Sequence, residues 1–245
     1  MSLHWGGVLT QWLASDAALL PSEVAAYLNL RLGWSVVLAW LCVVIVVRYG
    51  PVSKTPSWRR HGVALLAATS AGLPGSYGSA YWLGLVFQTP STMAVMLCGL
   101  LLWQQLRPAP VHPSGDAVGK QGADRAILAW AGMALLLGWA LLLDSFALLP
   151  VQLYACGFSP IVSGLVLLFL LLPWVVAPSP APSRIPRFGA CLALVCLLVF
   201  VVWRLPTGNV WDAVLDPLLW LALQAHLLRA AWRRKRSALR RLTGA

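Results

Sequence analysis

Residues 204–241 read RLPTGNVWDAVLDPLLWLALQAHLLRAAWRRKRSALRR, and the two ends of this stretch differ in chemistry. The first end carries the carboxylates Asp212 and Asp216, whereas the last end is rich in Arg and Lys. Between them lies Leu218–Leu228, an apolar segment long enough for three helical turns. Because Arg and Lys gather on the cytoplasmic side of membrane helices, the stretch predicts a crossing that ends in the cytoplasm.

The composition of the whole chain is typical of a protein solvated by lipid. Of its 245 residues, 60% are hydrophobic and 10% are charged, and the mean hydropathy is +0.77. A water-soluble domain has roughly 25% charged residues. The net charge of +11 does not indicate nucleic-acid binding, because the basic residues flank apolar segments instead of forming a soluble basic face.

Charge and hydropathy together predict an all-α integral membrane protein with about seven transmembrane helices, its N-terminus outside and its C-terminus cytoplasmic. The expected crossings are 25–47, two within 62–106, 126–149, 161–176, 188–203 and 218–228. All but two of the 18 Lys and Arg residues, Arg31 and Arg204, then lie on the cytoplasmic side. An even number of crossings would destroy this bias. The Arg-rich, Lys-poor loops favour a bacterial inner membrane.

Three regions follow from this topology. Residues 1–21 are expected to form an outer interfacial segment, since Trp5 and Trp12 belong to an apolar stripe at helical spacing, although a disordered leader has the same composition. No basic region precedes the first apolar stretch, which argues against a removable signal peptide. Residues 22–232 are expected to form a single seven-span domain, and 233–245 a basic cytoplasmic tail that contacts anionic lipid.

Residues 72–84 form the most irregular stretch, with four Gly residues, one Pro and several aromatic residues between two predicted crossings. Backbone that leaves a helix cannot face lipid. The stretch is therefore either a simple outer loop, with Tyr77 and Tyr81 among the lipid headgroups, or a re-entrant segment that lines a pocket.

Polar groups at membrane depth are costly, and they are the candidates for a functional site. Asp144 lies near the outer end of the fourth crossing, and Asp212 and Asp216 lie four residues apart on one face at the start of the seventh. The candidates for an outward-facing polar pocket are Asp144, Asp212, Asp216, Arg204, Gln88, Tyr77 and Tyr81, with Gln152 and Tyr154 nearby in the predicted topology.

The same carboxylates have a structural interpretation. Asp212 and Asp216 occupy first turns of a helix, where the dipole and unpaired N–H groups favour an anion, and either could pair with Arg204. Asp144 is not at a helix start, and its role is either functional or helix pairing. Deeper in the last crossing, Gln224 and His226 favour a hydrogen bond between helices over a haem ligand or a proton relay.

Neither a metal site nor a cofactor is predicted, because no His and Cys residues have ligand spacing. The chain also lacks the His-Glu-x-x-His, Gly-x-Ser-x-Gly and P-loop motifs, so we do not expect an enzyme. We expect a non-enzymatic accessory or assembly factor that binds another membrane protein. The alternative is a small transporter or proton-coupled carrier that uses the outer carboxylates. An enzyme acting on lipid at the outer interface is a weaker third interpretation.

Overall fold

The computed structural model describes the backbone of residues 19–50, 56–107, 117–150, 152–176 and 184–243. Side chains are described for the same residues except 117–130, 170–176, 184–190 and 237–243. Within these ranges the chain forms ten α-helices and one 3-10 turn, with no β-strand, so the all-α prediction is confirmed. Most of the expected outer interfacial segment 1–21 lies outside the described residues.

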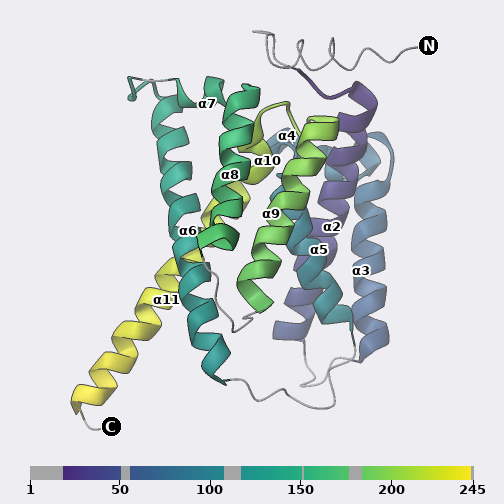
Figure 1. Cartoon of the computed structure of the whole chain (residues 1–245). Helices are drawn as coiled ribbons and strands as arrows, with labels where there is room; N and C mark the ends of the chain where they lie inside the picture. Colours follow the sequence, from purple (N-terminus) through teal and green to yellow (C-terminus); the bar gives the residue numbers. More distant parts are fainter. Residues whose placement is uncertain (1–18, 51–55, 108–116, 151, 177–183, 244–245) are drawn as a thin grey trace.

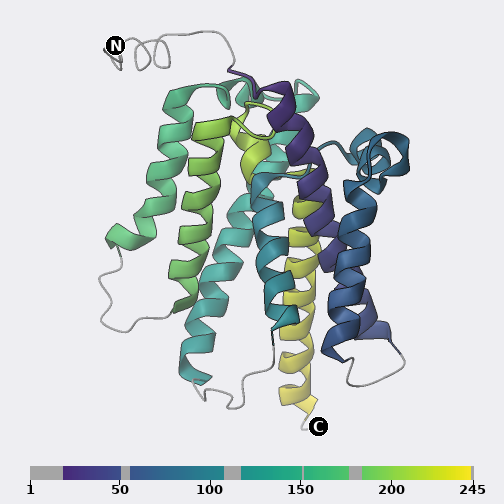
Figure 2. The ribbon, with the colours of Figure 1, turned by 90° about the vertical axis from the view of Figure 1, so that its right-hand side faces the viewer.

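Seven long helices run up and down side by side and form a bundle (Figures 1 and 2). They are α2 (Glu23–Tyr49), α3 (Ser57–Gly72), α5 (Thr92–Leu106), α6 (Ala117–Ser145), α8 (Pro160–Val176), α9 (Arg184–Trp203) and α11 (Pro217–Thr243). Each overlaps one of the seven segments expected to cross a membrane. The N-terminal end of the described chain and the C-terminus lie at opposite ends of the bundle (Figure 1).

By length and hydropathy, one helix among the described residues, α2, is able to cross a membrane. Shorter apolar stretches lie in α5, α6, α8 and α9. Only 28% of the most apolar window of α2 is buried inside the bundle. A central helix of a soluble protein would be mostly buried, so α2 is not in that position.

Short helices gather at one end of the bundle, which is the upper end in Figure 1. They are α4 (Ser79–Phe87), α7 (Leu153–Cys156) and α10 (Val210–Val214), and the 3-10 turn η1 (Gly75–Tyr77) precedes α4. The irregular stretch 72–84 thus consists of the end of α3, η1 and the start of α4. The sequence did not predict that a separate short helix follows this break.

Polar caps define where three of the long helices begin. Ser22 Oγ accepts the Ala25 N–H at 3.3 Å and so caps the start of α2. Ser91 caps α5 in the same way, its hydroxyl accepting the Ala94 N–H at 3.1 Å. In α11, Asp216 precedes Pro217, and proline suits the first helical position because its missing N–H would have no partner there.

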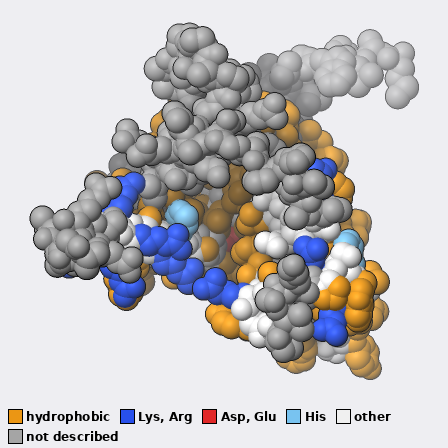
Figure 3. Space-filling model, turned by 90° about the horizontal axis from the view of Figure 1, so that it is seen from below, with side chains coloured by type: hydrophobic (Ala, Val, Ile, Leu, Met, Phe, Trp, Pro, Cys, Tyr) orange, Lys and Arg blue, Asp and Glu red, His pale blue; other side chains and the backbone are white. Residues whose placement is uncertain are grey.

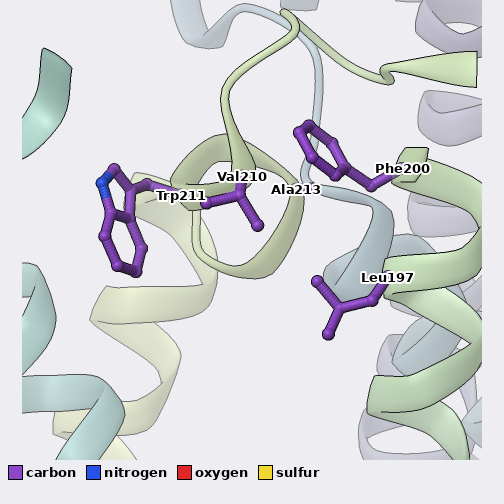
Figure 4. Packing of buried hydrophobic residues seen from close by; sticks show 5 residues of the cluster. All are labelled: Leu197, Phe200, Val210, Trp211 and Ala213. Carbon is purple, nitrogen blue, oxygen red and sulfur yellow. The ribbon is translucent and has the colours of Figure 1, made fainter. Parts of the chain in front are cut away.

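The core of the upper end is built where α10 enters the bundle. Val210 and Ala213 are fully buried, and they lie between Trp211 and the α9 residues Leu197 and Phe200 (Figure 4). Each buried side chain of this size stabilises the fold by about 1.5–3 kcal/mol relative to exposure, alanine contributing less. This packing fixes the 204–216 segment against α9, and so positions the carboxylates of Asp212 and Asp216.

Candidate functional site

Tyr154 of α7 joins two of the predicted carboxylates. Its backbone N–H donates to Asp144 Oδ2 at 2.7 Å, and its hydroxyl donates to Asp212 Oδ2 at 2.7 Å. Asp144 comes from the end of α6 and Asp212 from α10, 68 positions later by residue number. The fold therefore brings these two residues into one hydrogen-bonded network, which we call the Tyr154 network.

The loop between α9 and α10 completes the Tyr154 network. Thr207 Oγ1 donates to Asp212 Oδ2 at 2.5 Å, so this oxygen accepts two hydroxyl protons. Asn209 is fully buried; its Nδ2 donates to the Tyr154 carbonyl at 2.9 Å, and its Oδ1 accepts the Trp211 N–H at 3.0 Å. A buried amide with partners on both ends fixes the distance between α7 and α10.

Two further contacts hold α7 against α10. Trp211 Nε1 donates to the Leu153 carbonyl at 2.9 Å, and the Val210 N–H donates to the Gly157 carbonyl at 3.0 Å. A Cβ atom on Gly157 would collide with Asn209 Oδ1 and with the Trp211 ring. Only glycine allows this close approach of α7 to α10.

The environment of Tyr154 favours its protonated form. Partial burial and the hydrogen bond to the Asp212 carboxylate both raise the pKa of the phenol well above its usual value of 10. The hydroxyl therefore remains a donor to Asp212 over the whole physiological range.

A cleft of about 580 Å³ opens beside the Tyr154 network. Its lining residues are Leu141, Asp144, Ser145, Ala147, Leu149, Pro150, Gln152, Tyr154 and Ala155. Ala147 has a φ of 54°, which is uncommon for a residue with a Cβ and turns the chain sharply after α6. The cleft offers one carboxylate and one amide on a mainly apolar wall, which suits a small polar group attached to an apolar body.

Asp216 belongs to a different contact network. Its Oδ2 accepts the Ser91 N–H at 2.6 Å and its Oδ1 accepts the Leu219 N–H at 2.7 Å. Asp216 is 9% exposed and Ser91 is fully buried, so the bond to Ser91 is shielded from water, while the bond to Leu219 is partly buried. One carboxylate thus satisfies backbone donors at the first turns of α5 and α11, as the structural interpretation of this residue predicts.

Arg204 is buried at the end of α9, where its guanidinium carbon stands 5.3 Å from the centre of the Phe200 ring. Burial lowers the pKa of this guanidinium. Its φ of 56° turns the chain into the loop that leads to Thr207, and its carbonyl accepts the Gly208 N–H at 2.7 Å. The described hydrogen bonds of Asp212 and Asp216 go to hydroxyl and backbone groups, and not to Arg204.

The remaining outer candidates lie on the connection from α3 to α5. Tyr77 is 85% exposed, and Tyr81 packs edge to face on Trp82 with the ring centres 5.3 Å apart. Gln88 has a φ of 62°, and its backbone carbonyl accepts the Trp34 Nε1–H at 2.9 Å. None of these three residues is among those lining the cleft beside Tyr154.

The polar residues of the last crossing lie on α11, where Gln224 is half-buried and His226 is exposed. In the part of the chain that the structure describes, no group of three His, Cys, Asp or Glu residues could hold a metal ion.

Sequence reasoning underestimated Tyr154 and missed Thr207, Asn209 and Ser91. Two of these have a local signal, since Asn209 and Ser91 are the cap-forming type of residue directly before an apolar helix. No local signal places Tyr154 between Asp144 and Asp212, because that contact depends on how α6, α7 and α10 pack.

The chain matches no protein-family model, no curated protein and no solved structure.

Proposed function

We propose that this chain is a seven-span protein of the bacterial inner membrane that acts as a non-enzymatic accessory or assembly factor for another membrane protein. Large apolar side chains exposed around the bundle carry the first part of this proposal. Leu32, Leu66, Leu136, Leu168 and Leu198 come from five different long helices, and each is between 55% and 72% exposed. Soluble monomers expose apolar patches of only about 300–600 Å².

A lipid environment removes the cost of this exposure, because hydrocarbon solvates leucine as well as a protein core does. The bundle also follows the rule that polar backbone in a membrane must be satisfied internally, since seven long helices make up most of the described chain. Apart from Arg31 and Arg204, the basic residues of the described chain belong to helix segments at the end opposite α4, α7 and α10, which supports a cytoplasmic side at the lower end of Figure 1.

The hydrogen bonds that the three carboxylates accept within the protein support an accessory role over transport. Asp216 accepts two backbone N–H groups, Asp212 accepts two hydroxyl groups, and Asp144 accepts the N–H of Tyr154. In each case the carboxylate joins two segments of the fold. A carrier needs a carboxylate that can exchange its partner for a proton or a substrate.

The carrier remains the alternative, and one observation favours it. The first turns of α5 and α11 meet at Asp216 inside the bundle, and each follows a short helix, α4 or α10. Interrupted helices whose N-termini converge inside a bundle are typical of transporter binding sites.

Membrane insertion is tested by expressing the full chain, floating the membranes in a density gradient and extracting them with carbonate. We expect the chain to stay with the membrane. Topology is then tested with fusions of an alkaline-phosphatase reporter after Gly50, Arg107 and Ala245, which should all be inactive because these sites are cytoplasmic. A fusion after Pro150 should be active, and the opposite pattern would refute the seven-span topology.

The accessory role is tested by purification in a gentle detergent from the native host. A stoichiometric membrane-protein partner is expected to remain bound, and variants with apolar surface residues changed should lose it without loss of thermal stability. A variant with all three Asp residues changed does not distinguish an accessory factor from a carrier, because Asp212 and Asp216 also stabilise the fold. The conservative change Tyr154→Phe does distinguish them, since it alters only the Tyr154 network. Solute uptake by proteoliposomes of the chain alone would favour the carrier.

A further inference from the structure

The first two thirds of α11 present an apolar stripe that the bundle does not cover. Leu221, Ala225, Leu228 and Trp232 are spaced by four, three and four residues, so they share one helical face. All four are exposed, with Leu228 at 71% and Trp232 at 62%.

The stripe lies on a different face from the one that fastens α11 to the bundle. Trp220 Nε1 donates to the Leu135 carbonyl of α6 at 3.3 Å, and the Trp220 ring packs edge to face on Trp139 at 5.2 Å. Further along the helix, Gln224 and Leu227 on the same side as Trp220 are half-buried, whereas the stripe is exposed. Towards its C-terminal end the helix diverges from the others (Figure 1).

Basic side chains flank the stripe on one side. Arg229, Arg233 and Arg236, spaced by four and three residues, lie along this side on the helical wheel, and Lys235 lies on the other; all four are exposed. Arg236 stacks on Trp232, with the guanidinium carbon 4.7 Å from the ring centre. Seen from below, Lys and Arg side chains form a row beside a hollow with apolar walls (Figure 3).

We propose that α11 leaves the cytoplasmic leaflet near Trp232 and that Arg229, Arg233 and Arg236 bind anionic phospholipid headgroups there. An apolar stripe that ends in a Trp and a group of Arg residues is typical of a crossing helix where it reaches the cytoplasmic interface. The stripe enters the acyl region, and the guanidinium groups reach the phosphates. This inference rests on the proposed membrane location, and it names the three residues that bind the anionic lipid expected at this end of the chain.

The experiment uses the full chain in nanodiscs of phosphatidylcholine alone or of an equimolar mixture with phosphatidylglycerol. The readout is the rate of trypsin cleavage after Arg234 and Lys235, measured by the mass of the released C-terminal peptide. Each Arg near an anionic surface strengthens binding about fivefold, so we expect cleavage at least about tenfold slower in the mixed discs. This protection should disappear in about 1 M salt, where charges are screened within about 3 Å.

In the variant R229Q/R233Q/R236Q, the trypsin cleavage rates in the two kinds of disc should differ by about twofold or less. The matched control R48Q/R59Q/R107Q removes the same charge from exposed residues on other helix ends and should retain the full effect. Equal cleavage rates in the two discs would overturn the proposal. Slow trypsin cleavage that is equal in both discs and insensitive to salt would also overturn the proposal, since a protein contact would then cover the stripe.

Failure of the membrane location is separated from failure of this inference by the carbonate extraction described above. A chain that is extracted by carbonate refutes both. A chain that stays in the bilayer but is cleaved at the same rate in both discs refutes only the lipid-binding role of α11.

Discussion

Changing Asp216 to alanine removes a side chain that satisfies backbone donors at the starts of both α5 and α11. The bonds lost are those from the Ser91 N–H at 2.6 Å and the Leu219 N–H at 2.7 Å. A hydrogen bond to a charged group contributes about 1.5–3 kcal/mol, and loss of a helix cap costs about 1 kcal/mol. We therefore expect Asp216→Ala to lower the free energy of unfolding by about 3–5 kcal/mol.

Asp216→Asn should lower the free energy of unfolding by less than Asp216→Ala does. Its oxygen can still accept the Leu219 N–H, but its amide group then faces the buried Ser91 N–H, and two donors cannot bond to each other. We expect a loss of about 1–3 kcal/mol for one buried donor without a partner. The order of stability should thus be wild type, then asparagine, then alanine.

The assay is thermal unfolding of the purified chain in a mild detergent, followed by tryptophan fluorescence. For a chain of this length, 1 kcal/mol corresponds to about 2–4 °C in Tm, so Asp216→Ala should lower Tm by about 6–20 °C. Ser22→Ala is the matched control, because it removes an exposed cap with a single long bond of 3.3 Å. It should lower Tm by only about 1–4 °C.

A double-mutant cycle tests the contact between Asp216 and Ser91. Ser91 has a φ of −60°, which proline can adopt, and Ser91→Pro replaces the N–H by a Cδ atom that would collide with Asp216 Oδ2, whereas Ser91→Ala deletes only the hydroxyl cap. In the Asp216→Ala background, Ser91→Pro should cost less than it does in the wild type, because the donor that it removes no longer has an acceptor. Additive effects, or an Asp216→Ala shift no larger than that of Ser22→Ala, would refute the bridging role of Asp216.

Two further predictions concern the Tyr154 network and the contact between α6 and α11. Tyr154→Phe should cost about 1 kcal/mol at neutral pH through the lost bond to Asp212. Because the folded chain raises the pKa of this phenol, the bond is fully present below pH 10 and is lost at higher pH, so the difference in Tm between wild type and variant should narrow above pH 10. A difference that widens there would contradict this assignment. Gly138→Ala places a Cβ against the Trp220 ring and should lower the free energy of unfolding by about 1–3 kcal/mol. The control Gly132→Ala lies on the same helix, where a Cβ would have no atom within 4 Å, and it should be neutral or stabilising. Equal Tm values for the two variants would exclude close packing of Gly138 on Trp220.

Much of the fold could be predicted because it depends on short-range patterns. Apolar runs of helix length, separated by Pro, Gly and basic residues, marked the seven long helices. The short helices α4 and α10 were not predicted. A helix of five to nine residues is too short for a periodic pattern, and α10 forms because its apolar residues fit against Leu197 and Phe200 of α9.

The sequence by itself determined the helical class of the chain, the positions of the long helices and the types of polar residue available at their ends, because these follow from local hydropathy and capping chemistry. Only the tertiary structure decided how those residues are used. Asp212 and Asp216 are four positions apart, yet one binds Tyr154 of α7 and the other the N–H of Ser91, since Leu215 is extended between α10 and α11 and separates the two helix starts. Partners that lie 58 and 125 residues away along the chain are set by packing, which no local pattern encodes.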